Sequence, residues 1–253
     1  SNGSSALSGL KLRNNCLEEA GVRELARLFT PGSTVTIRAL DLGTNDLCDG
    51  GAQVLATALN LCCNKTLESL QLPNNHIGDE GARVLSKLLN DGSSITSLNL
   101  AMNVISPIGA CHLAEALREN STLSSLELRS NDVRDDGAIA LASALPTSAL
   151  ASIGLEDNRV GDDGACALAG ALCGAEVGSL FSSTSHRSSP QRWLVLCTAH
   201  MKERQIEELR GRPAREGFHL DLTHNLFKDQ GVCALAVALA KGADVLLEDN
   251  DIG

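Results

Sequence analysis

The residues best suited to acid–base or metal chemistry are His219, Asp221 and His224, which occur in one short run. Alternate residues of a β-strand point to the same side, so His219 and Asp221 would share an exposed face on which they could bind a metal or transfer a proton. Polar residues on an exposed strand are the commoner explanation, and no motif of zinc proteases, serine hydrolases or phosphate-binding loops accompanies them. We therefore expect no catalytic site, no metal and no cofactor.

Two carboxylate pairs, Asp135–Asp136 and Asp162–Asp163, are further candidates for cation binding. Each pair precedes an apolar stretch in which a helix is expected. Carboxylates at the start of a helix cap free N–H groups and interact favourably with the helix dipole. We therefore interpret both pairs as helix caps.

The chain has nine cysteines, an odd number, and none of them forms a C-x-x-C pair. The sequence therefore supports neither a zinc site nor a redox motif. We expect free and mostly buried thiols in a reducing compartment.

The composition disfavours several classes of function. Aromatic residues make up 2% of the chain, which argues against stacking platforms. Lys and Arg number 21 against 31 for Asp and Glu, and this net charge of -10 disfavours nucleic acids and anionic membranes and favours a basic protein partner. No apolar run approaches the roughly 18 residues of a membrane span, and no signal peptide is evident, so we expect a soluble, cytoplasmic protein.

The elements that position these residues belong to an internal repeat of the form L-x-x-L-x-L-x-x-N. The apolar residues five and three positions before each asparagine alternate with polar ones, which predicts a short strand. The spacing of the asparagines is 25 to 30 residues, except for one gap of 67. The closing asparagines are Asn15, Asn45, Asn75, Asn103, Asn131, Asn158, Asn225 and Asn250.

A helix is expected after each strand. An apolar residue follows each asparagine by two positions, an acid usually by four, and further apolar residues at ten and fourteen make one helical face. All seven complete repeats carry glycine at position six: Gly21, Gly51, Gly81, Gly109, Gly137, Gly164 and Gly231. Glycine inside a helix costs about 1 kcal/mol relative to alanine, so its recurrence predicts a close approach between neighbouring repeats.

This pattern resembles the leucine-rich repeats of the ribonuclease-inhibitor type over residues 7–172 and 218–253. The best-fitting stretch matches at nearly every defining position, with Leu67, Leu70, Leu72, Asn75, Ile77 and Gly81. The resemblance implies an α/β solenoid, or horseshoe, of about eight repeats, with parallel strands on the concave side and helices on the convex side. It also implies that the asparagine side chains form a ladder that satisfies the backbone of the turns.

Residues 1–172 should form repeats one to six, and residues 218–253 repeats seven and eight, the last of them truncated. The chain opens without Met and stops just after a strand, which predicts a fragment of a longer solenoid.

Residues 173–217 interrupt the period, and their serine-rich part, 178–190, is expected to be disordered. Removing 39 residues would turn the spacing of 67 into 28, which favours a clean insertion or an error in the gene model. The alternative is a degenerate repeat whose strand is 194–197. That repeat would place Gln205 where glycine is expected and Pro213 inside its helix, so we favour the insertion.

The strand face that points away from the core is the candidate binding surface, because acids gather in its second half. The predicted protein-interaction face comprises Glu127, Arg129, Glu156, Asp157, Asp221, Asp244 and Glu248. Glu127, Glu156, Asp221 and Glu248 come from consecutive recognisable strands and are expected to align in one row. Parallel strands lie about 4.8 Å apart, so such a row would create a negative potential that recruits a basic protein surface.

The resemblance is more specific for fold than for function. It implies a non-catalytic protein–protein interaction scaffold that binds through the concave face, such as the sensing region of an NLR-like immune receptor. A GTPase-activating protein that resembles the Ran activator is the alternative.

Overall fold

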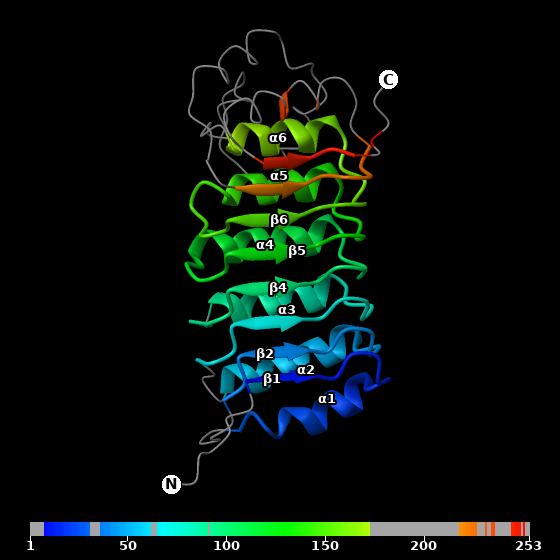
Figure 1. Cartoon of the computed structure of the whole chain (residues 1–253), viewed down its shortest axis with the longest axis vertical. Coiled ribbons are helices and arrows are strands. Elements are labelled where there is room, and N and C mark those ends of the chain that lie inside the picture. The colour runs from blue at the N-terminus through cyan, green and yellow to red at the C-terminus, as the bar shows by residue number, and fades with distance from the viewer. Residues whose placement is uncertain are drawn as a thin grey trace.

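In the computed structural model, strands and helices alternate along a solenoid, with the sheet on one side and the helices on the other (Figure 1). The structure describes residues 8–30, 36–61, 65–90, 92–172, 218–226, 231, 234–235, 244–248 and 250. Within these ranges eight strands form a single parallel sheet in sequence order. The predicted α/β leucine-rich-repeat solenoid is confirmed.

The strands are three residues long and each, up to β6, is followed by one helix. They are β1 (Gly9–Lys11), β2 (Ala39–Asp41), β3 (Ser69–Gln71), β4 (Ser97–Asn99), β5 (Ser125–Glu127), β6 (Ser152–Gly154), β7 (His219–Asp221) and β8 (Asp244–Leu246). The helices are α1 (Glu18–Ala26), α2 (Cys48–Leu61), α3 (Asp79–Asn90), α4 (Pro107–Glu119), α5 (Arg134–Ala144) and α6 (Asp162–Leu172). No helix in the described part of the chain is long and apolar enough to cross a membrane.

Neighbouring strands pair in register, so that equivalent positions of successive repeats stand side by side. The strand β6 pairs directly with β7, and Ile153 lies opposite Leu220 despite their separation in the sequence. Residues 173–217 lie outside the described residues, so their assignment as an insertion stays a prediction.

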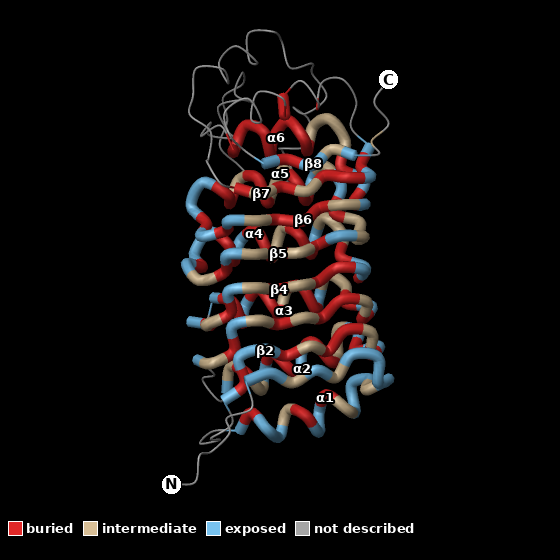
Figure 2. Tube along the Cα trace, in the orientation of Figure 1, coloured by how far each residue is buried: buried red, intermediate tan, exposed pale blue. Residues whose placement is uncertain are grey.

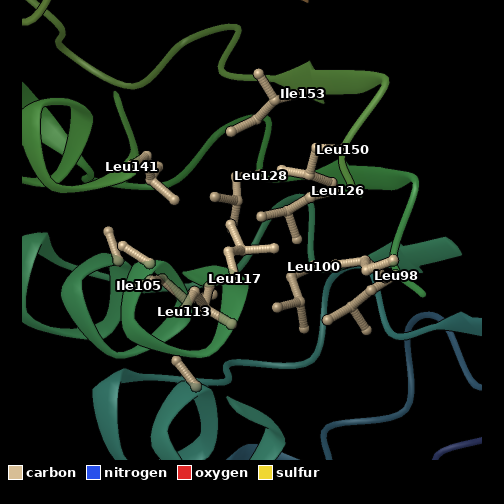
Figure 3. Close-up of a cluster of buried hydrophobic side chains, with 14 of the residues drawn as sticks. Leu98, Leu100, Ile105, Leu113, Leu117, Leu126, Leu128, Leu141, Leu150 and Ile153 are labelled. Carbon is tan, nitrogen blue, oxygen red and sulfur yellow. The ribbon is translucent and has the colours of Figure 1, made fainter. Parts of the chain in front are cut away.

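An aliphatic core fills the space between the sheet and the helices (Figures 2 and 3). In the fourth repeat, residues from the strand, the turn and the helix converge there and are at most 1% exposed: Leu98, Leu100, Ile105, Leu113 and Leu117 (Figure 3). Fully burying one such side chain contributes about 1.5 to 3 kcal/mol. Stacking the repeats therefore stabilises units that could not bury their apolar faces alone.

The recurrent glycine lies where two repeats approach closely, as predicted. A Cβ atom on Gly109 would lie 2.6 Å from Asp79 Oδ1, 2.8 Å from Ile105 Cγ2 and 3.2 Å from Ala82 Cβ. Asp79 and Ala82 belong to the preceding repeat, and a side chain at Gly109 would push the two repeats apart.

Four aspartates that follow the asparagines by four positions cap the helix of the following repeat, whereas the sequence suggested their own helix. Asp79 Oδ1 accepts hydrogen bonds from the N–H groups of Ser106 (2.9 Å) and Gly109 (2.8 Å), and its Oδ2 accepts one from Ser106 Oγ (2.6 Å). We call Asp49, Asp79, Asp135 and Asp162, which share this arrangement, the inter-repeat carboxylates.

The backbone conformation at the start of the next helix depends on whether an inter-repeat carboxylate is present. Where the preceding repeat has Glu19 or Pro107 instead, the first helical residues, Cys48 and Arg134, adopt left-handed φ values of 51° and 52°. Their N–H groups then donate to the backbone oxygen of the next asparagine, at 2.8 Å and 3.0 Å. In repeats three, four and six, where the preceding repeat supplies an aspartate, the equivalent N–H group donates to the carboxylate of that aspartate.

Replacing Asp79 by alanine should lower the free energy of unfolding by about 2 kcal/mol, because three donors of the next repeat lose a charged acceptor. Equilibrium urea unfolding followed by circular dichroism measures the change. The matched control is Asp136→Ala, whose exposed side chain should change stability by less than about 0.5 kcal/mol. Equal losses in the two variants would contradict the capping role.

Candidate functional site

The exposed face of the sheet is organised in three columns, because the strands pair in register. The first column begins each strand and contains Ser69, Ser97, Ser125, Ser152, His219 and Asp244 in its later part. The middle column contains Lys11, Asp41, Gln71, Asn99, Glu127, Gly154, Asp221 and Leu246. The third column, two residues further on, ends with Arg129, Glu156, Thr223 and Glu248.

The predicted single row of four acids is wrong. Glu127 and Asp221 belong to the middle column, where Gly154 separates them. Glu156 and Glu248 belong to the third column. The four residues do come from consecutive strands, but pairing in register aligns equal positions, and the sequence argument combined two different positions.

The acids of the middle column accept hydrogen bonds from backbone N–H groups just after their own strand. Glu127 Oε1 accepts the N–H of Arg129 at 2.9 Å, and Asp221 Oδ1 accepts the N–H of Thr223 at 3.0 Å. Burial raises the pKa of the Glu127 carboxyl, and the nearby Asp221 adds to this, whereas the hydrogen bond from Arg129 lowers it. The carboxylate of Glu127 lies over Gly154, where a Cβ atom would collide with it.

Two other acids of the predicted face lie beside basic side chains, of which the histidines are charged only when protonated. Glu156 lies between Arg129, with a shortest N–O distance of 3.7 Å, and His224, at 3.6 Å. Asp244 Oδ2 lies 2.8 Å from Nδ1 of His219. Asp157 and Glu248 are exposed to solvent. The surface is therefore acidic, but its negative potential is smaller than the number of carboxylates suggests.

The three residues that first suggested chemistry have separate partners. His219 contacts Asp244, His224 contacts Glu156, and Asp221 accepts a backbone N–H. Within the ranges that the structure describes, no group of three or more His, Cys, Asp and Glu residues could hold a metal ion.

Cysteine was predicted to be mostly buried, and this is wrong for the four cysteines that the structure describes. All four are free, but Cys16 and Cys48 are exposed and Cys111 is half-buried, which leaves Cys166 as the buried one. Cys16 lies in the turn between β1 and α1, and Cys48 is the first residue of α2. Burial raises the pKa of the Cys111 thiol, and the charge of Glu115 raises it further.

The asparagine side chains join consecutive turns. Asn103 Oδ1 accepts the N–H groups of Asn75 and Ile77, both at 3.0 Å, and its Nδ2 donates to the carbonyls of Leu72 (3.1 Å) and Leu100 (2.9 Å). Side-chain hydrogen bonds of this kind are present at Asn15, Asn45, Asn75, Asn103, Asn131, Asn158, Asn225 and Asn250. In all but the first, the amide also reaches the preceding repeat.

Burial raises the pKa of Asp163 to about 6, and the neighbouring Asp135 and Asp162 add to the shift. Because the folded state binds this proton more tightly than the unfolded chain, stability should fall as the pH rises from about 4 to about 6. Asp163→Asn should therefore stabilise the protein near pH 7 and have little effect near pH 4.

Thermal unfolding at both pH values measures this difference. The control is Glu119→Gln, an exposed carboxylate at the end of α4 that should show a smaller difference between the two conditions. An Asp163→Asn effect that is the same at both pH values would refute the prediction.

The sequence argument missed an apolar group on the turns. Met102, Val104 and Ile108 are large, apolar and exposed. The search followed the strand face, whereas these residues flank the turn between β4 and α4. Aligning the repeats by their asparagines would have revealed them, because most equivalent positions elsewhere are polar.

Comparison with known proteins supports the fold. A family model described as "Leucine Rich repeat" matches residues 63–86 and 119–142. No curated protein sequence matches the chain. Among solved structures, "Leiomodin-1 Actin-Binding Site 2 (ABS2)" is similar with a TM-score of 0.46 and 22% identity, over 53% of this chain and 77% of that chain. The two matched segments agree with the parallel stack of strand–helix units, which has the fold of a leucine-rich-repeat solenoid.

Proposed function

We propose that this chain is a non-catalytic protein–protein interaction scaffold whose strand face binds a partner with a basic surface. The observation that carries the proposal is the face of the parallel sheet that the described part of the chain leaves uncovered. Such sheets are usually covered by helices on both faces, but the described helices cover one face here (Figure 1). Solenoids use surfaces of this kind to bind proteins.

The side chains of the face suit a protein partner. Serines at the start of four consecutive strands, Ser69, Ser97, Ser125 and Ser152, are small and let another backbone approach. Six carboxylates and one arginine follow toward β8: Glu127, Arg129, Glu156, Asp157, Asp221, Asp244 and Glu248. Their excess negative charge favours Lys and Arg on the partner and faster association at low salt.

The resemblance to ribonuclease-inhibitor-type repeats extends this proposal to the sensing region of a cytoplasmic NLR-like protein that needs no cofactor. A GTPase-activating role like that of the Ran activator is the alternative. Stimulated GTP hydrolysis by Ran-like GTPases would favour the alternative over the scaffold.

Site-specific photo-crosslinking tests the binding face. A photo-reactive residue at Ser125, on the strand face, should crosslink a basic protein, whereas one at Glu115, on the helix side, should not. A variant with Glu127→Gln, Glu156→Gln, Asp221→Asn and Glu248→Gln removes four charges and keeps oxygen acceptors for the backbone. It should weaken binding about tenfold at low salt and flatten the salt dependence. Equal crosslinking from both positions, or an unchanged salt dependence, would contradict the proposal.

A further inference from the structure

The turn between β4 and α4 carries an exposed apolar group. Met102 is 46% exposed, Val104 is 58% exposed and Ile108 is 62% exposed. We call these three residues the apolar edge patch. It lies where the strands end, at the right in Figure 1, and so adjoins the strand face without belonging to it.

The positions of the patch are mostly polar in the other described repeats. The residue before the asparagine is Asn14, Thr44, Asn74, Met102, Ser130, Asp157 or His224. The residue after it is Cys16, Asp46, His76, Val104, Asp132, Arg159 or Leu226. The residue five positions after it is Ala20, Gly50, Glu80, Ile108, Asp136 or Asp163. Among these repeats, the fourth alone has a large apolar residue at all three positions.

The backbone of the turn does not explain Met102. All seven residues at its position have left-handed φ values, between 53° and 60°. Asn, Asp and His are favoured in this conformation, whereas a bulky apolar residue is unfavourable. Local preference and the observed residue therefore conflict at an exposed site, and such conflicts concentrate where a protein binds something.

The charges around the patch indicate what would bind it. The basic groups beside it are engaged: His76 Nδ1 lies 3.2 Å from Asp46, and Arg134 and Arg159 bind Asp132 at 2.6 Å and 3.1 Å. Asp136, which occupies in the fifth repeat the position of Ile108, is exposed and has no ion-pair partner among the described residues. With His76 neutral, the rim has three carboxylates, those of Asp46, Asp132 and Asp136, against the two guanidinium groups of Arg134 and Arg159, and so carries one excess negative charge.

We propose that the apolar edge patch is a docking site for a segment of another protein that presents a bulky apolar side chain flanked by Lys or Arg. The apolar side chain covers Met102, Val104 and Ile108, and the basic residues face Asp136 and the rim. This contact is separate from the strand face, so it stands or falls independently of the function proposed above.

Selection from a library of random peptides displayed on phage, with the full chain as target, tests the site. Enriched peptides should contain a large apolar residue next to Lys or Arg. A variant with Val104→Ser and Ile108→Ser should bind them at least about tenfold more weakly, as is typical of a lost anchoring contact. Asp136→Asn should weaken binding less and reduce its dependence on salt.

Two controls locate the contact. Leu61→Ser removes an equally exposed apolar side chain at the end of α2 and should leave binding unchanged. The four-fold strand-face variant should also bind the peptides normally, which separates this site from the proposed function. The variants at Val104, Ile108, Asp136 and Leu61 should retain the thermal unfolding midpoint of the parent, because the altered side chains are exposed.

Several results would overturn the proposal. These are the selection of no peptide, the selection of peptides without the apolar and basic pattern, and equal binding to the variant with Val104→Ser and Ile108→Ser. Dimerisation of the chain that this same variant abolishes, measured by analytical ultracentrifugation, would assign the patch to a second copy instead.

Discussion

Replacing Asn103 by alanine is expected to lower the free energy of unfolding by about 4 kcal/mol, since each buried polar group left unpaired costs about 1 to 3 kcal/mol. The Asn103 side chain is 7% exposed, so water cannot readily replace it. The N–H groups of Asn75 and Ile77 and the carbonyls of Leu72 and Leu100 would lose a partner. Equilibrium urea unfolding measures the loss.

Asn74→Ala is the matched control, because it changes the same residue type in an adjacent turn. Among the described residues, the Asn74 side chain makes one long hydrogen bond, 3.4 Å from Nδ2 to Thr44 Oγ1. Asn74 has a left-handed φ of 54°, in which alanine is less favourable than asparagine, so this variant should lose about 1 kcal/mol, well below the loss expected at Asn103. If both variants lost the same amount, the ladder would not be a main source of stability.

Replacing Gly109 by alanine should destabilise the protein by about 2 kcal/mol, although alanine is the better helix former by about 1 kcal/mol. The new Cβ atom would lie 2.6 Å from Asp79 Oδ1 and 2.8 Å from Ile105 Cγ2. Asp79 cannot simply move away, because it accepts three hydrogen bonds from Ser106 and Gly109. Thermal unfolding should show a lower midpoint.

Gly50→Ala tests whether the contact rather than the residue type decides the outcome. At this position, also in the first turn of a helix, the added Cβ atom would meet the flexible and exposed side chain of Glu19. Glu19 can rotate away, so the helix preference of alanine should dominate and stability should stay equal or rise. A loss as large as that of Gly109→Ala would contradict the argument.

The sequence predicts the repeat well, because single residue types answer local needs. The asparagine must satisfy a turn backbone, and Gly109 must leave room for Asp79. The partner of each capping acid was not predictable, because it depends on how far one repeat is displaced from the next. Spacing along the chain shows that Asp79 precedes a helix, but it does not show that the following helix is nearer to its carboxylate.

The site was predicted less well, for the same reason. Strand alternation correctly places Glu127 and Glu156 on the exposed face of the sheet. It does not show that Glu156 pairs with Arg129 or that Glu127 binds a backbone N–H, because these contacts depend on side-chain conformation. In the apolar edge patch, Met102 and Val104 lie in a turn, where neither strand nor helix periodicity applies, and Ile108 is an exposed residue of α4.

The side-chain links between repeats run in two opposite directions. Each asparagine binds the turn before it, as Asn103 binds Asn75, and each inter-repeat carboxylate binds the turn after it, as Asp79 binds Ser106. The solenoid therefore has a direction, and its two ends differ in which of these side-chain links they lack. Loss of a unit on the carboxyl side strips a buried amide from the turn before it. Loss of a unit on the amino side removes only the carboxylate that caps the next helix. The fifth repeat, which follows Pro107, already folds without such a carboxylate. Unfolding should therefore advance more readily from the carboxyl side.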